Sequence, residues 1–83
     1  MIEQLSLLTR VIIDSIGTTC FYEHGYLYRI IYHYGTNLWM DSDGVAHKDN
    51  GPAWIYRINN GDLVEHYYTH GVCKGIFING VKQ

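Results

Sequence analysis

The sequence predicts an α+β fold, with a short N-terminal helix over residues 1–17 packed on an antiparallel β-meander over residues 18–83. Two observations support this class. Apolar residues in the first segment repeat with helical spacing. Beyond Gly17, short runs of strand-forming residues alternate with glycines, as in a series of hairpins. The length of 83 residues, without a linker or low-complexity stretch, predicts one domain.

The helix is predicted from an apolar stripe with i, i+3, i+7 spacing. The stripe consists of Leu5, Leu8, Ile12 and Ile16. Gly17 follows it and suits the left-handed backbone conformation that commonly ends a helix. The competing interpretation is a strand, because the run VII at 11–13 is β-branched.

The meander is predicted from glycines that recur every 7 to 10 residues, namely Gly25, Gly35, Gly44, Gly51, Gly61, Gly71 and Gly80. Most of them follow a residue that tolerates a turn, and Asn-Gly and Asp-Gly pairs favour tight hairpin turns because both positions need positive φ. The runs between the glycines are rich in β-formers: YLYRIIYHY, NLWM, PAWIYRI, DLVEHYYT and IFI. We expect about five or six strands.

Pro52, the only proline, precedes one of these strands, where a missing N–H does little harm. Alternation along PAWIYRI places two sets of side chains on opposite faces of the sheet. One set is Ala53, Ile55 and Arg57, and the other is Trp54, Tyr56 and Ile58. We expect the second set to face the core.

Charge and composition narrow the class of protein. The net charge is −2 and the six Lys and Arg residues are scattered, so nucleic-acid binding is not expected. The N-terminus does not resemble a signal peptide and no apolar run is long enough to cross a bilayer, so we expect a cytoplasmic protein without membrane association.

Cys20 and Cys73 are expected as free thiols, because cytoplasmic proteins rarely form disulfides. A half-covered small sheet exposes apolar area, so we expect a homodimer or larger oligomer.

The segment LWMDSDGVAHKDNGPAWIYRINNGDLVEHYYTHGVCKG resembles the MORN-like hairpin repeats, in the variant built on His-Arg-x-Asp-Gly-Pro-Ala that occurs in phage and bacterial proteins. The matching positions are Trp39, Asp43-Gly44, His47-Lys48, Gly51-Pro52-Ala53, Gly61 and Tyr67-Tyr68-Thr69-His70-Gly71. Three positions depart from the pattern: Lys48 replaces Arg, Asn50 replaces Asp and His70 replaces Asn. The resemblance covers residues 39–75 and leaves the N-terminal part unexplained.

The resemblance implies an extended ladder of hairpins that serves as an interaction surface, and it brings no shared catalytic residues. Together with the small size, it implies a phage-type accessory protein. The concrete hypothesis is a non-enzymatic protein that inhibits a host protein, for example a defence or CRISPR component, by protein–protein contact. Its location would be the host cytoplasm if it is phage-encoded.

Metal and catalytic chemistry are not expected. His66 and His70 have a spacing that could share zinc on a helix, about 6 Å apart, but not on a strand, where they lie about 13 Å apart. Nothing in the spacing of Cys20 or Cys73 indicates a nucleophile–base pair. The acids of DSDG are expected to bond within turns rather than to bind calcium, because the rest of the calcium-loop motif is absent. We therefore expect no cofactor.

The aromatic residues are the best candidates for a binding surface, because tyrosine and arginine are typical of interface hot spots. Strand alternation in YLYRIIYHYG predicts a row of four tyrosines on one face. The candidate binding residues are Tyr26, Tyr28, Arg29, Tyr32, Tyr34, His47, Lys48, Trp54, Tyr56 and Arg57. The row forms either the wall of a core or an exposed binding surface.

Two alternative functions stay open. In the first, an oligomer sequesters a small nucleotide-like signalling molecule in a pocket lined by tyrosines, with Arg29, Arg57 or Lys48 on its phosphates. In the second, the chain is a structural or antitoxin-like repeat fragment without a ligand, stable only with one cognate chain.

Overall fold

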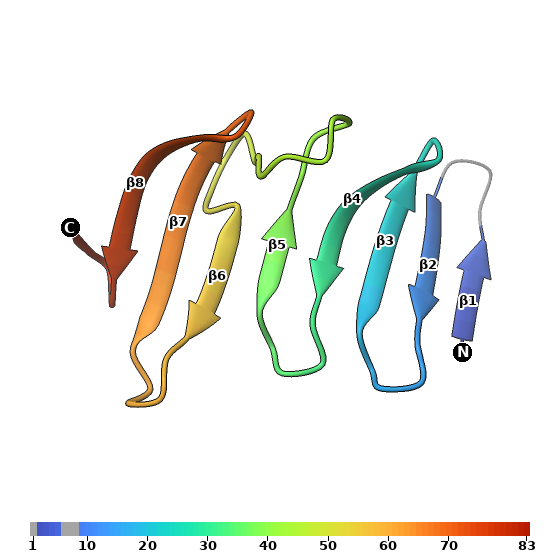
Figure 1. Ribbon diagram of the computed structural model, residues 1–83, viewed down its shortest axis with the longest axis horizontal. Coiled ribbons are helices and arrows are strands. Elements are labelled where there is room, and N and C mark those ends of the chain that lie inside the picture. The colour runs from blue at the N-terminus through green and yellow to red at the C-terminus, as the bar shows by residue number, and fades with distance from the viewer. Residues whose placement is uncertain (1, 6–8) are drawn as a thin grey trace.

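The computed structural model describes residues 2–5 and 9–83, and these form a single antiparallel sheet of nine strands (Figure 1). Each strand pairs with the next one along the chain. The strands are β1 Ile2–Leu5, β2 Thr9–Ile13, β3 Thr19–Glu23, β4 Tyr26–Ile31, β5 Asn37–Trp39, β6 Trp54–Arg57, β7 Leu63–Thr69, β8 Val72–Ile78 and β9 Val81–Lys82. Every described element is a strand, so the fold is all-β and the α+β prediction was wrong. The described residues include no helix with the length and apolarity needed to cross a membrane.

The predicted N-terminal helix is replaced by strands. β1 pairs with β2, and β2 pairs in turn with β3, with Val11 opposite Phe21. The β-branched run at 11–13 prefers this extended state, and pairing on both sides supplies its backbone hydrogen bonds. Of the expected stripe, Ile16 lies in a turn with 64% of its surface exposed, and Leu8 lies outside the described residues. Gly17 has the expected positive φ of 93°, but it closes a tight turn.

The glycine-based prediction of turns is confirmed at six of its seven glycines, and these turns are of two kinds. Gly51 instead lies inside the loop between β5 and β6, and residues 18–83 form seven strands rather than five or six. In His24-Gly25, His70-Gly71 and Asn79-Gly80 both residues have positive φ, which the two-residue hairpin turn requires. Four further turns span four residues each. In each of them the N–H of the final glycine donates to the carbonyl of the first residue. These are Asp14–Gly17, Tyr32–Gly35, Asp41–Gly44 and Ile58–Gly61.

The sheet is a single layer. The described chain measures 40 × 27 × 15 Å, and its buried hydrophobic residues are Ala53, with 0% of its surface exposed, and Val64, with 5%. The expectation that Trp54, Tyr56 and Ile58 face a core was wrong, because Trp54 is 37% exposed and Ile58 44%. Both faces of the sheet are therefore open to solvent in the monomer.

A β-bulge occurs at the same place in two hairpins that lie 46 positions apart. In the first hairpin, Phe21 pairs with Arg29 and Tyr22 with Leu27, so Tyr28 is an extra residue in β4. In the second, Tyr67 pairs with Gly75 and Tyr68 with Cys73, so Lys74 is the extra residue in β8. Each bulge interrupts the alternation of side chains between the two faces.

Candidate functional site

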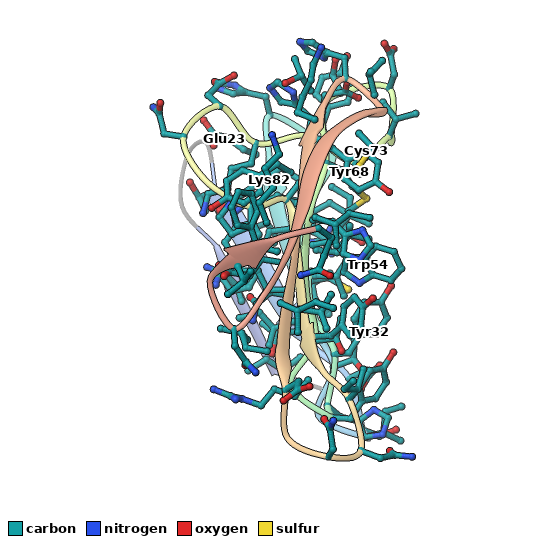
Figure 2. The ribbon with its side chains drawn as sticks, turned by 90° about the vertical axis from the view of Figure 1, so that its left-hand side faces the viewer. Glu23, Tyr32, Trp54, Tyr68, Cys73 and Lys82 are labelled. Carbon is teal, nitrogen blue, oxygen red and sulfur yellow. The ribbon has the colours of Figure 1, made fainter. Side chains whose placement is uncertain are left out.

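One face of the sheet collects half-exposed aromatic side chains from the middle strands (Figure 2). Figure 2 shows Tyr32, Trp54 and Tyr68 on this side of the sheet, and Glu23 and Lys82 on the other. We call it the aromatic face and define it by Tyr32, Tyr34, Leu38, Trp54, Tyr56, His66 and Tyr68.

Strand register builds the aromatic face. Trp54 of β6 is paired with Leu38 of β5 on one side and with His66 of β7 on the other. Residues that oppose each other across an antiparallel ladder share a face, so these three side chains form one row across the sheet. Tyr56 and Tyr68 follow two residues along the strand from Trp54 and His66 and lie on the same face.

The rings of this face contact one another. The ring of Trp54 lies 4.8 Å from that of His66 and 5.0 Å from that of Tyr56. The Tyr56 hydroxyl is hydrogen-bonded to His66 Nε2 at 2.9 Å, and the ring of Tyr68 is stacked on that of His66. Burial among these rings lowers the pKa of His66 below its ordinary value of 6.5. His66 therefore belongs to a neutral, mostly apolar surface at pH 7.

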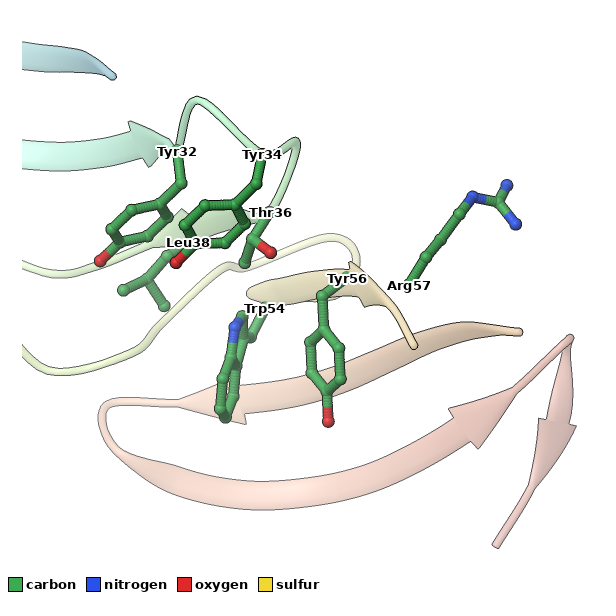
Figure 3. A pocket seen from close by; sticks show the side chains of 7 residues that line it. All are labelled: Tyr32, Tyr34, Thr36, Leu38, Trp54, Tyr56 and Arg57. Carbon is green, nitrogen blue, oxygen red and sulfur yellow. The ribbon is translucent and has the colours of Figure 1, made fainter. Parts of the chain in front are cut away.

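Two adjoining hollows shape the aromatic face. One has a volume of about 370 Å³ (Figure 3) and is lined by Tyr32, Tyr34, Thr36, Leu38, Trp54, Tyr56 and Arg57. The other has a volume of about 380 Å³ and is lined by Leu38, Val45, Ala46, Trp54, Tyr68 and Gly71. Leu38 and Trp54 line both hollows, so the indole of Trp54 stands between them.

The structure unites four of the predicted binding residues and separates others from them. Tyr32, Tyr34, Trp54 and Tyr56 line the first hollow together. Arg57 also lines it, but its guanidinium points away in Figure 3 and its Nη1 donates to the carbonyl of Gly61 at 2.9 Å.

The prediction of four tyrosines in one row was wrong, because it assumed unbroken alternation along β4. The bulge places Tyr28 and Arg29 on the same face, where both contact the ring of Phe21. Tyr26 pairs directly with Glu23 and lies on that face as well. Only Tyr32 and Tyr34 of the row belong to the aromatic face.

The opposite face holds Arg29 and Lys48, and we call it the cation face, defined by Phe21, Tyr28, Arg29, Trp39 and Lys48. Arg10 lies on the side of the aromatic face, on β2, with its guanidinium 5.9 Å from the ring centre of Tyr22. The guanidinium of Arg29 lies 5.0 Å from the ring centre of Phe21 and 4.3 Å from that of Trp39. Lys48 Nζ lies 3.8 Å from the ring centre of Trp39. Arg29 also donates from Nη2 to the side-chain oxygen of Asn37 at 2.9 Å. Both cations are thus held against aromatic rings by cation–π contacts.

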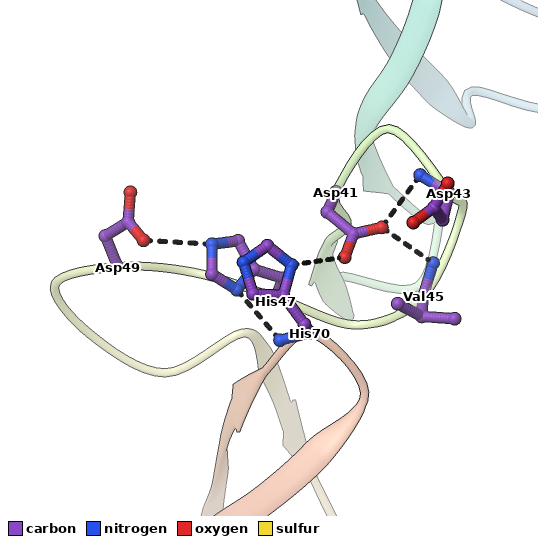
Figure 4. Close-up of polar contacts among 6 residues, drawn as sticks. All are labelled: Asp41, Asp43, Val45, His47, Asp49 and His70. Carbon is purple, nitrogen blue, oxygen red and sulfur yellow. Dashed lines mark hydrogen bonds and ion pairs between the residues drawn. The ribbon is translucent and has the colours of Figure 1, made fainter.

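His47 has a structural position in the loop between β5 and β6 (Figure 4). Its Nδ1 accepts the backbone N–H of His70 at 3.0 Å, and its Nε2 lies 2.9 Å from the carboxylate of Asp49. The rings of His47 and His70 are stacked with their centres 3.9 Å apart. His70 Nδ1 is 2.6 Å from Asp41 Oδ2. These contacts attach the loop to the turn between β7 and β8.

Asp41 anchors the other end of this cluster. Its Oδ1 accepts the backbone N–H groups of Asp43 and Val45, at 2.9 and 3.4 Å. The hydrogen bond with His70, followed by these backbone bonds, lowers the pKa of the Asp41 carboxyl. Among the described residues, no three His, Cys, Asp or Glu side chains come together in a way that could hold a metal ion.

Sequence reasoning missed Leu38, His66 and Tyr68 as members of the aromatic face. His66 was considered only as a zinc ligand with His70, and the structure places these two in different settings, one on the face and one in a turn. A signal was present in the spacing of His66 and Tyr68 along one strand, because residues two apart share a face.

Comparison with protein-family models, with curated proteins and with solved structures finds no match to this chain. The resemblance to MORN-like repeats stays a prediction. Fold and site define the chain as a single-layer β-meander with chemically different faces, one aromatic and one cationic.

Proposed function

We propose that the protein is a non-enzymatic binding module that uses the aromatic face to contact a protein partner. The observation that carries the proposal is the gathering of half-exposed aromatic side chains from neighbouring strands around two adjoining hollows. Buried centres of protein interfaces are enriched in tyrosine and tryptophan and depleted of charge. The rigid sheet holds these side chains in place, which lowers the entropy cost of binding.

On the aromatic face, the distribution of charge favours a protein partner over a nucleotide-like molecule. A nucleotide needs cations beside the rings that stack on its base, to bind its phosphates. Arg29 and Lys48 lie on the opposite face, and the guanidinium of Arg57 is bonded away from the hollow that it lines. The aromatic face therefore offers stacking surfaces without a nearby cation directed at a phosphate.

The more specific version of the proposal is a phage-type accessory protein that inhibits a host protein, such as a defence or CRISPR component, in the host cytoplasm. Its support is the resemblance of residues 39–75 to MORN-like repeats of phage and bacterial proteins. In this version, the aromatic face covers a functional surface of the host protein.

The test is capture of host proteins from lysate by immobilised wild-type protein, Trp54→Ala and Tyr26→Ala. Tyr26 is a matched control, because it is an aromatic residue on the cation face and is 57% exposed. We expect Trp54→Ala to weaken capture of a specific partner at least about tenfold, as for a hot-spot residue, and Tyr26→Ala to retain it. Far-UV circular dichroism checks that both variants are folded.

Two outcomes would contradict the proposal. Equal capture by wild type and Trp54→Ala would show that the aromatic face does not bind the partner. A native mass spectrum of the purified protein with a bound small molecule, lost on denaturation and lost in Trp54→Ala, would instead support sequestering of that molecule.

A further inference from the structure

The aromatic face is too large and too apolar to suit a lone monomer. The sheet is one layer, 15 Å thick, whereas domains bury their apolar surfaces between at least two layers. The whole sheet measures 40 by 27 Å in its plane, so a second sheet laid over it has room for the ~800 Å² that each partner contributes to a stable interface. A second sheet laid over this face would therefore bury enough surface for a stable dimer.

The charge of the aromatic face fits a second copy of the same chain. No Asp, Glu or Lys lines either hollow, and Arg57 has its guanidinium turned toward the carbonyl of Gly61. Two copies of such a neutral surface can pack against each other without repulsion between like charges. The cation face is less suited to a second copy, because burial of its charged side chains, Glu23 as well as Arg29 and Lys48, would cost desolvation.

The shape of the face is also self-complementary. In a two-fold contact the same patch faces itself, so a projecting side chain must find a recess within that patch. Trp54 is 37% exposed and stands beside the hollow lined by Tyr32, Leu38 and Tyr56. Insertion of each Trp54 into the hollow of the other copy requires a two-fold axis that lies in the plane of the interface, midway between Trp54 and that hollow.

We propose that two copies pack aromatic face against aromatic face around such an axis, each inserting Trp54 into the hollow of the other. The inference rests on the proposed function in one respect, because the same face binds the protein partner. The dimer is then the form without partner, and the partner displaces one copy. Closing the face in this way also protects the rings from non-specific association.

The experiment is sedimentation velocity of purified wild-type protein and three variants over a wide range of concentration. Trp54→Arg and Tyr34→Arg place a charge in the proposed interface, and Tyr26→Arg places the same charge on the cation face. Tyr34 and Tyr26 are 66% and 57% exposed, so neither substitution disturbs buried packing. We expect wild type and Tyr26→Arg to form dimers with equal affinity. Trp54→Arg and Tyr34→Arg should raise the dissociation constant about thirtyfold or more.

The outcomes that would overturn the dimer differ from the outcome that would overturn the proposed function. A wild-type protein that stays monomeric at all concentrations would overturn the dimer. So would a dimer that both interface variants leave unchanged. In either case the proposed function stands if Trp54→Ala still loses capture of the partner. A dimer that behaves as expected, combined with unchanged capture by Trp54→Ala, would overturn the proposed function alone.

Discussion

At the scale of the residue, His66 shows how a polar group is accommodated on an aromatic surface. Its Nε2 is bonded to the Tyr56 hydroxyl, while its Nδ1 is buried and has no partner among the described residues. The charged ring carries a proton on both nitrogens, so protonation would leave a buried N–H unpaired. Desolvation by burial is the main reason that the neutral form of His66 is favoured on this face, and the unpaired N–H adds to it.

The lowered pKa of His66 predicts a pH-dependent stability. A folded-state pKa below the unfolded value of 6.5 means that the unfolded state binds the proton more tightly. The stabilisation that results from this difference in the pKa of His66 is complete above pH 6.5. It is lost as the pH falls from 6.5 to the folded-state pKa. We expect the urea midpoint of wild type to drop across this window, and His66→Phe to reduce the drop. His24→Gln, a change of an exposed turn histidine, should leave the drop as in wild type.

The hydroxyl of Tyr56 provides a second test at this scale. Tyr56→Phe removes the bond to His66 Nε2 and keeps the ring, so we expect a loss of about 1 kcal/mol in the free energy of unfolding. Tyr34→Phe removes a hydroxyl from the same hollow that has no hydrogen-bond partner among the described residues, and should change the stability little. Urea unfolding of both variants measures the difference. Equal losses would show that the bond to His66 is not stabilising.

At the scale of the element, turns and bulges decide which side chains each strand places on each face of the sheet. The Gly-Pro-Ala block places Ala53 so that its N–H donates to the carbonyl of His66 and its carbonyl accepts from the N–H of Trp39. Ala53 thereby joins β5 to β7 just before β6 begins. The cluster of Asp41, His47 and His70 then attaches the remainder of this loop to the turn between β7 and β8.

The Asp41 cluster predicts the behaviour of this loop in acid. The lowered pKa of Asp41 means that its contribution to stability is present above the unfolded pKa of 3.8 and is lost as the pH falls through the folded pKa. We expect Asp41→Asn to lower the urea midpoint at pH 7 and to reduce the loss of stability in acid. Asp43→Asn is the matched control, because only its backbone N–H bonds to Asp41. An equal effect of both substitutions would contradict a specific role of the Asp41 carboxylate.

The two bulged hairpins offer a matched pair of glycines. Gly25 and Gly71 occupy the same turn position with φ of 82° and 83°. Alanine costs about 1–2 kcal/mol at either site because of the left-handed backbone. At Gly71 the new Cβ would lie in ordinary van der Waals contact with Val45, 3.4 Å from its Cβ, whereas at Gly25 it meets open space. The added contact offsets part of the backbone cost, so we expect Gly71→Ala to lower the thermal midpoint less than Gly25→Ala. The reverse order would contradict the packing of Val45 against this turn.

At the scale of the whole molecule, the structure is one layer whose two faces differ in chemistry. Few side chains are withdrawn from water in the monomer, so the free energy of unfolding should gain strongly from association. We expect the thermal midpoint of wild type to rise with protein concentration, and that of Trp54→Arg to rise much less. Scanning calorimetry at several concentrations measures this. A midpoint independent of concentration in wild type would contradict stabilisation by a second copy.

The sequence by itself determined the meander and its turns. Asn-Gly, His-Gly and Asp-Gly pairs specify the local backbone, since glycine supplies positive φ without steric cost, and they could be located without tertiary information. It also predicted Tyr32, Tyr34, Trp54 and Tyr56 as candidate binding residues, although not that they line one hollow together. The N-terminal segment could not be assigned, because its apolar spacing fits a helix while its β-branched residues fit a strand.

Only the tertiary structure decided which side chains share a face. Strand pairing depends on partners that are distant in sequence, and each bulge shifts the alternation by one residue. The bulge at Tyr28 moved Tyr26 and Tyr28 to the face of Arg29 and away from Tyr32, and the register of β5, β6 and β7 aligned Leu38, Trp54 and His66. The position of Arg29 and Lys48 on the face opposite Tyr32, Trp54 and Tyr56 also follows from strand pairing. Local residue preferences do not predict this pairing, because the same sequence with one bulge fewer would place Tyr26 and Tyr28 on the face of Tyr32.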